Sequence, residues 1–182
     1  LFRQRLWRYR MEQSMSRRGN CWGAARKPQI AWRSYTEGWY WFSVDLTFNE
    51  LQSLDRPATL PMNGCDIGET TRSNLEVFGP DFLCQATDDG LLTVYNGHEK
   101  SIRDRVRAHF TLNNDRTGAL GLRHFMLHER TWMLRVFSAP CLESIPEALR
   151  SRVEQLMSSK SGRSAVESAW RVSYGWPLLC KQ

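Results

Sequence analysis

Apolar side chains recur at every second position in several short segments from residue 40 onward, and this alternation constrains the fold more than any other feature. In residues 40–46, large apolar side chains at the even positions alternate with Trp41, Ser43 and Asp45. A period of two is typical of a β-strand with one buried face. Strand-like segments then follow at 75–78, 82–87, 91–95, 102–112, 119–127, 131–137 and 170–174, separated by Gly, Pro, Asn and Asp. The sequence therefore predicts about eight short strands in consecutive order.

Helices are predicted at three places between or before these strands. Thr47 and Glu50 have the spacing of a capping box and open a helix over 48–54, which Pro57 stops. Ser144 and Glu147 have the same spacing before a helix over 146–157. Residues 1–18 contain no Pro or Gly and read as a short basic amphipathic helix. The Pro- and Gly-containing residues 57–74 are predicted to form a long loop, and 113–118 to form a turn.

The expected fold class is mainly β (α+β), as an antiparallel up-and-down barrel or a strongly curved meander sheet. Closing the sheet into a barrel would remove the open strand edges. A helix follows the seventh strand, and Gly38-Trp39-Tyr40-Trp41 lies on the first one. This layout resembles the lipocalin or calycin architecture, in which a C-terminal helix lies against the barrel. The resemblance concerns the layout and includes no diagnostic motif.

Charge divides the chain into a basic arm and a nearly neutral body. Residues 1–33 carry nine basic side chains and one acid, whereas the remainder carries 16 basic and 18 acidic ones. We therefore expect an arm with its connector at 1–35 and one β-rich domain at 36–182. Such asymmetry indicates an anionic partner, although a solvated tail would show it too. The arm residues predicted to bind this partner are Arg3, Arg5, Arg8, Arg10, Arg17 and Arg18.

A second basic feature lies in residues 102–112. If this segment is a strand, Arg103, Arg105 and Arg107 project from the same face at about 6.5 to 7 Å spacing. The following segment, 119–127, contains no acid that could neutralise them. We therefore predict that these three arginines contact an anionic surface, with a plain solvated face as the alternative.

Motifs for common enzyme chemistry are absent from the sequence. It contains no G-x-S-x-G, no phosphate-binding G-x-x-x-x-G-K-[ST] and no G-x-G-x-x-G. The five cysteines include no C-x-x-C pair, and neither Cys65 in its loop nor His124 with His128 forms a persuasive catalytic or metal site. We therefore predict no catalytic residue, no metal and no cofactor. No apolar stretch approaches the roughly 18 to 20 residues that cross a bilayer.

Four tryptophans of the predicted domain have one expected role and two alternatives. Trp39, Trp41, Trp132 and Trp170 are expected mainly in the core, with a ligand cavity or an interface anchor as alternatives.

These features favour a non-catalytic accessory subunit of a larger complex. It would be intracellular, in a mitochondrion or plastid, and would bind protein subunits, with ribosomal RNA or an anionic membrane surface as further candidates. One alternative is a calycin-like barrel that binds a lipid or a tetrapyrrole pigment, lined by Tyr40, Phe42, Phe110 and Trp132. Another is a capsid-type protein whose arm neutralises packaged nucleic acid.

Overall fold

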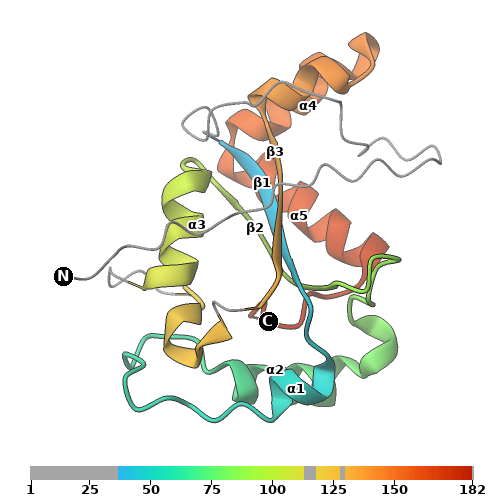
Figure 1. Ribbon diagram of the computed structural model, residues 1–182. Helices are drawn as coiled ribbons and strands as arrows, with labels where there is room; N and C mark the ends of the chain where they lie inside the picture. The colour runs from blue at the N-terminus through green and yellow to red at the C-terminus, as the bar shows by residue number, and fades with distance from the viewer. Residues whose placement is uncertain (1–36, 113–117, 128–129, 182) are drawn as a thin grey trace.

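The centre of the protein is an open sheet of three antiparallel strands. The computed structural model describes residues 37–112, 118–127 and 130–181. The middle strand is β1 (Gly38–Val44), with β2 (Leu92–Glu99) on one side and β3 (Trp132–Ser138) on the other (Figure 1). The fold is therefore mixed α/β. The predicted barrel is wrong because the sheet does not close, and the predicted meander is wrong because β1 lies between β2 and β3.

Helices cover both faces of this sheet. In chain order they are α1 (Phe48–Gln52), α2 (Ile67–Phe78), η2 (Pro80–Phe82), α3 (Ile102–Thr111), η3 (Leu122–Phe125), η5 (Ala139–Ser144), α4 (Glu147–Ser158) and α5 (Lys160–Tyr174). Figure 1 shows α3 on one side of the sheet and α5 on the other, with α1 and α2 across one end. None of the helices in the described part of the chain has the length and apolar character needed to span a membrane.

β1 is buried on both faces because a helix lies over each of them. Tyr40 and Phe42 face α3 and belong to the main core, and Phe42 is fully buried. Trp39 faces the other way and packs with Phe137 of β3 and Met157 of α4. Burying one such side chain contributes about 1.5 to 3 kcal/mol to the free energy of folding. Because both faces of β1 carry such side chains, β1 lies at the centre of the fold.

Residues after α5 cover the outer edge of β2. The backbone N–H of Leu179 donates to the carbonyl of Val94 at 2.7 Å. The side-chain amide of Asn74, on α2, donates to the carbonyls of Leu178 at 2.7 Å and Cys180 at 3.0 Å. Both leucines are buried in the main core. This C-terminal segment therefore joins α2 to the sheet.

Several predicted elements are confirmed. Strands occur within 40–46, 91–95 and 131–137, and helices within 48–54 and 146–157. The capping box of Thr47 and Glu50 is present. The one predicted at Ser144 is wrong: Pro146 precedes α4 without a side-chain cap, and the Ser144 hydroxyl instead donates to the Cys141 carbonyl at 2.6 Å.

The other predicted strands are wrong, and most of these segments are helical. Residues 75–78 end α2, 82–87 follow η2 with isolated bridges, 119–127 contain η3, and 170–174 end α5. The predicted loop 57–74 is wrong in its second part, where α2 begins after Asp66, whose side chain accepts a hydrogen bond from the Glu69 N–H. β2 also continues past Asn96 to Glu99, and a Cβ on Gly97 would lie 2.9 Å from the Tyr40 hydroxyl oxygen.

The segment 102–112 shows why alternation misled the prediction. α3 buries Ile102, Val106 and Phe110, which have helical spacing, against the sheet. Its other side also buries Ala108 and Leu112, against a second cluster that contains Leu60 and Ala119. A helix buried on two sides has apolar residues at positions that also fit a period of two.

The predicted arm and connector, with Arg3, Arg5, Arg8, Arg10, Arg17 and Arg18, lie outside the described residues, as do 113–117 of the predicted turn and His128.

Candidate functional site

Three aromatic side chains form a row on the α5 side of the sheet, which we call the aromatic row. It consists of Trp41, Trp170 and Tyr174. The ring centroids of Trp41 and Trp170 are 6.4 Å apart, and those of Trp170 and Tyr174 are 5.2 Å apart. Tyr174 is 49% exposed, and the two tryptophans are half-buried. The row is therefore half-buried at Trp41 and Trp170 and open to solvent at Tyr174.

Secondary structure explains why these residues meet. Trp41 occupies an odd position of β1, and odd positions point toward α5. Trp170 and Tyr174 are four residues apart, so they lie on one side of α5. Gly175, with φ +94°, ends the helix directly after the row. A period of two on β1 and a period of 3.6 on α5 thus place three separate residues on one surface.

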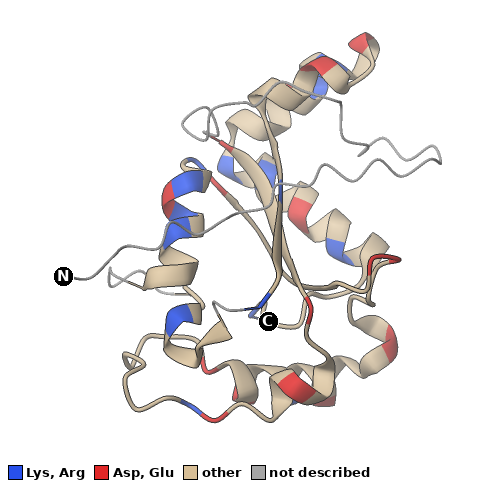
Figure 2. Cartoon of the chain, in the orientation of Figure 1, with Lys and Arg blue, Asp and Glu red and all other residues tan. Residues whose placement is uncertain are grey.

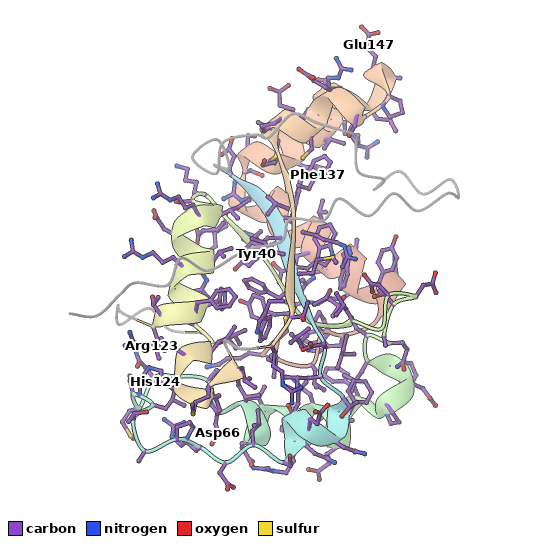
Figure 3. All side chains as sticks on the ribbon, in the orientation of Figure 1. Tyr40, Asp66, Arg123, His124, Phe137 and Glu147 are labelled. Atoms are coloured by element: carbon purple, nitrogen blue, oxygen red, sulfur yellow. The ribbon has the colours of Figure 1, made fainter. Side chains whose placement is uncertain are left out.

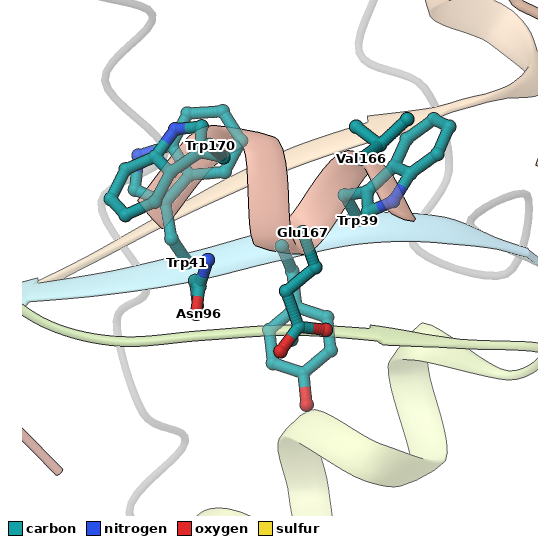
Figure 4. Close-up of a pocket in the computed structure, with 8 residues that line it drawn as sticks. Trp39, Trp41, Asn96, Val166, Glu167 and Trp170 are labelled. Carbon is teal, nitrogen blue, oxygen red and sulfur yellow. The ribbon is translucent and has the colours of Figure 1, made fainter. Parts of the chain in front are cut away.

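A small cavity lies beside the aromatic row, between α5 and the sheet. Its volume is about 20 Å³, which is room for one water-sized group. Figure 4 shows Trp41 and Trp170 at one side of it and Trp39 with Val166 at the other. Asn96, Gly97, Tyr40 and Glu167 complete the lining. The cavity is large enough for a methyl group and much too small for a drug-sized ligand.

An ionic network fixes α5 to β2 next to this cavity. Glu167 and Arg171 form an ion pair along the helix, and each side chain is 16% exposed. The Arg171 Nε donates to Asn96 Oδ1 at 2.9 Å, and its guanidinium lies 4.4 Å from the ring centroid of Trp176. Because these groups link β2, α5 and the C-terminal segment, they hold the aromatic row in one orientation.

Burial changes the titration of two groups in this network. It raises the pKa of Glu167, against the opposing effect of the Arg171 charge. It lowers the pKa of His98, and the charge of Arg163 lowers it further. His98 Nε2 lies 3.7 Å from Glu167 Oε2, and its buried Nδ1 has no hydrogen-bond partner among the residues that the structure describes. The network is therefore built on one strong ion pair, with His98 at its edge.

A second polar cluster lies on the opposite face of the sheet, beneath α3. His109 is fully buried, and its Nε2 is 3.0 Å from the Tyr40 hydroxyl. Arg105 interacts with the Tyr40 and Tyr95 hydroxyls and donates to the Gly118 carbonyl at 3.1 Å. Burial raises the pKa of both tyrosines, to about 12 for Tyr95. Figure 3 shows Tyr40 in the interior of the molecule. The cluster is a core network that connects α3 to the sheet.

The predicted arginine row does not exist as a strand face, because its residues lie on α3. The helix places Arg103 and Arg107 one turn apart on the exposed side and turns the half-buried Arg105 toward the sheet. The geometry of the prediction is thus wrong. That these arginines bind a partner stays a prediction.

The four predicted ligand-lining residues do come together. Phe42 lies 5.7 Å from Phe110 and 6.2 Å from Trp132 between ring centroids, and 5.7 Å from Tyr40. All three contacts are edge-to-face, and Phe110 also contacts Trp132 at 5.8 Å. The rings pack against one another in the core. The ligand hypothesis depended on a closed barrel, which the open sheet does not provide.

The remaining candidate residues are held by local contacts. Cys65 is buried, its Sγ lies 3.4 Å from Thr70 Oγ1, and burial raises its pKa. His124 Nδ1 lies 3.2 Å from Thr59 Oγ1. In the described part of the chain, no group of three or more His, Cys, Asp or Glu side chains could hold a metal ion.

Sequence reasoning missed the network around α5. Glu167 and Arg171 have the i, i+4 spacing of a helical ion pair, which would have indicated a helix over this segment. Asn96 and His109 carried no such signal, because their partners are 75 and 69 residues away along the chain.

Comparison with known proteins gave no relative: no protein-family model matches the chain, and neither a curated protein nor a solved structure does.

Proposed function

We propose that this chain is a non-catalytic accessory subunit of a larger assembly and that it binds a protein partner through the aromatic row. The observation that carries the proposal is the partly exposed row of ring contacts between Trp41, Trp170 and Tyr174 beside a small cavity. Aromatic side chains and arginines are enriched at the centres of protein interfaces. A few such residues commonly supply most of the binding energy.

The surroundings of the row favour docking in three further ways. The cavity between Trp41 and Trp39 could accept a methyl-sized group of the partner, as interface pockets do. The ion pair of Glu167 with Arg171 holds α5 in place, so little conformational entropy would be lost on binding. Arg135 and Asp89 form an ion pair at 3.3 Å, and Arg135 is the cross-strand neighbour of Trp41. A charged rim of this kind surrounds many interface cores.

The states of the buried nucleophiles support a non-catalytic role. Burial raises the pKa of Cys65, and it raises the pKa of both Cys84 and Cys180 to about 12. These thiols are protonated at neutral pH, and the thiolate is the form that attacks a substrate. His109 is enclosed in the core, where a substrate has no access.

The arginine-rich arm belongs to the same proposal. Nine basic residues in 1–33 suit an assembly whose anionic groups neutralise them, and a mitochondrial or plastid complex is the setting we propose. Protein subunits are the partners of the aromatic row, whereas the arm would add affinity through charge.

A sedimentation experiment tests the role of the row. The tagged full chain is expressed in cells of the source organism, and native extracts are separated on a sucrose gradient. We expect the wild-type chain to sediment with a particle many times its own mass of 21.2 kDa. The double variant Trp170→Ala with Tyr174→Ala should move to the light fractions, because both rings of α5 are lost.

Val172→Ala is the matched control, since Val172 is on α5 but is 88% exposed and lies outside the aromatic row. Its sedimentation should equal that of the wild type. Tyr174→Ala alone keeps the half-buried Trp170 and serves as the milder variant, with circular dichroism confirming that each protein is folded. A wild-type chain that sediments as a free monomer, or a folded double variant that stays with the particle, would contradict the proposal.

A further inference from the structure

Half of the described arginines have a carboxylate within 4.0 Å of the guanidinium. These are the pairs Arg56–Asp66, Arg72–Glu69, Arg130–Glu50, Arg135–Asp89, Arg163–Glu37 and Arg171–Glu167. Arg103 and Arg107 of α3 and Arg123 of η3 have no such partner among the described residues. All three are exposed. We call them the α3–η3 arginines.

These three arginines lie on one side of the molecule. Residues 103 and 107 are one helical turn apart, which puts their Cβ atoms about 5 to 6 Å from each other. η3 packs against α3. Figure 2 shows the basic residues of α3 and η3 along the same edge, and Figure 3 shows Arg123 at that edge below α3. The arrangement is a basic surface built from two elements.

Acidic side chains do little to offset this surface. Asp104 is the acid of α3, and it accepts a hydrogen bond from the Ser101 hydroxyl at 2.8 Å. On α4, by contrast, Arg150 and Arg152 also lack a carboxylate within 4.0 Å among the described residues, but Glu147 and Glu154 flank them along the helix. The elements that carry the α3–η3 arginines thus hold one acidic side chain, Asp104, whereas α4 holds two beside its two arginines.

We propose that the α3–η3 arginines bind the phosphate backbone of a nucleic acid. A guanidinium presents a planar set of donors that matches the oxygens of a phosphate, and arginine is enriched where phosphates are recognised. Successive phosphates of one strand are spaced about 3.4 Å along the helix axis of a duplex, so two guanidinium groups one turn apart can reach neighbouring or next-neighbouring phosphates. The contacts are to the backbone and carry no sequence preference.

The shape of α3 favours a nucleic acid over a membrane. An interfacial helix inserts an apolar face into the lipid beside its basic residues. The apolar face of α3, with Ile102, Val106 and Phe110, is instead buried against the sheet. The surface that remains at residues 103, 104, 107 and 111 is polar and charged. Because α3 and the aromatic row are on opposite faces of the sheet, this inference does not depend on the docking proposal.

Arg105 has a different role from its neighbours. Its guanidinium interacts with the hydroxyls of Tyr40 and Tyr95 and with the Gly118 carbonyl. Replacing it would disturb the core, so it is left unchanged in the test.

Fluorescence anisotropy with a labelled 20-nucleotide RNA of mixed sequence tests the inference on the full chain. The triple variant Arg103→Gln, Arg107→Gln and Arg123→Gln should bind about tenfold or more weakly at 100 mM salt. The plot of log K against log salt should become less steep by about 2 to 3, since each lost phosphate contact contributes about 0.7 to 0.9 to the magnitude of its slope. The arm is present in every variant, so its share of the slope cancels in the comparison.

The control triple variant Arg150→Gln, Arg152→Gln and Lys160→Gln removes the same charge from the α4–α5 end and should bind within about twofold of the wild type. A second triple variant, Arg103→Lys, Arg107→Lys and Arg123→Lys, keeps the charge; it should keep most of the salt slope while losing some affinity. No RNA binding by the wild type, or equal binding by the wild type and the folded Gln variant, overturns the inference. So does a Gln variant that loses binding to vesicles with 30% anionic lipid but keeps its RNA affinity.

Discussion

The Nε2 of His109 lies 3.0 Å from the hydroxyl of Tyr40, in the closed space between α3 and β1. The backbone N–H of Leu120 donates to the other ring nitrogen, Nδ1, at 3.3 Å. Nε2 therefore carries the proton and donates it to the Tyr40 oxygen. Burial lowers the pKa of His109 well below its ordinary value, and the positive charge of Arg105 lowers it further. The imidazole is neutral in the folded protein.

This relationship predicts that acid weakens the fold. Unfolded His109 titrates near pH 6.5, so below that pH the unfolded state binds a proton that the folded state does not. The contribution of His109 is therefore complete above about pH 6.5 and decreases as the pH falls, by about 1.4 kcal/mol per pH unit down to its folded pKa. Urea unfolding at several pH values between 7.5 and 5 measures this contribution to the free energy of unfolding. His109→Gln should reduce the pH slope by about that amount, whereas His124→Gln should reduce it by less, because burial and the charge of Arg123 also lower the pKa of His124 but that side chain is partly exposed. Equal slopes in all three proteins would contradict a neutral buried His109.

The ion pair between Glu167 and Arg171 predicts strong coupling between the two side chains. Both are mostly buried, so removing either one leaves a charge with little solvent. In a double-mutant cycle with Glu167→Gln and Arg171→Gln, we expect a coupling free energy of about 1 to 3 kcal/mol. The surface pair Arg72 with Glu69 is the comparison, and it should give about 0.2 to 1 kcal/mol. Chemical denaturation of the four proteins in each cycle measures their free energies of unfolding. Additive effects within 0.3 kcal/mol at Glu167 and Arg171 would show that the pair does not hold α5.

Gly175 predicts a large cost for a single added methyl group. Its φ is +94°, and a Cβ there would lie 2.8 Å from backbone atoms of Leu83 and Cys84. Gly90 has a similar φ of +75°, but a Cβ on it would meet no atom within 4 Å. Backbone strain should lower the free energy of unfolding of both alanine variants by about 1 to 2 kcal/mol. The close contact should lower that of Gly175→Ala by about 1 to 3 kcal/mol more. Thermal unfolding measures the difference. Variants of equal stability would mean that the Leu83 backbone can move away freely.

The thiols predict an order of chemical labelling. Cys84 and Cys180 are buried and their pKa values are about 12, so about one thiol in ten thousand is ionised at pH 8. Cys65 is also buried, with a raised pKa. Cys141 is partly exposed and should react first with iodoacetamide among the four cysteines that the structure describes. Mass spectrometry of peptides gives the order, and the buried three should react only after urea is added. Fast labelling of Cys180 in the native protein would contradict its place in the core.

The strands were predictable from sequence where the period-two alternation and the residue types of the segment both indicated a strand. In 40–46 and 131–137 the alternation coincides with β-branched and aromatic residues, and turn residues bound each segment, so these predictions were right. In 102–112 the apolar residues at 108 and 112 belong to a second cluster that includes Leu60, far away in the chain. A tertiary contact of that kind leaves no local signal, so the segment was assigned to the wrong period.

The candidate site was predictable only in its components. The tryptophans at 41 and 170 were recognised as core or interface residues, but nothing near them in the sequence indicates that they form one row with Tyr174. Val172 made the end of α5 look like a strand, because an exposed valine sits between two aromatics. The arginines at 103 and 107 were selected for their charge, and that selection does not depend on whether the segment is a strand or a helix. Their spacing and direction do depend on it.

The C-terminal segment has a consequence for how the protein is made. Leu178 and Leu179 complete the core beside β2, but about 40 residues separate Ser138, where β3 ends, from Leu178. A ribosome adds about 5 to 20 residues per second, so the three strands emerge about 2 to 8 s before the residues that cover the edge of β2. During this interval the Val94 carbonyl and the apolar surface around it are open to other nascent chains. Translation speed and chaperone supply should therefore affect the yield of this domain more than the stability of the finished fold would suggest.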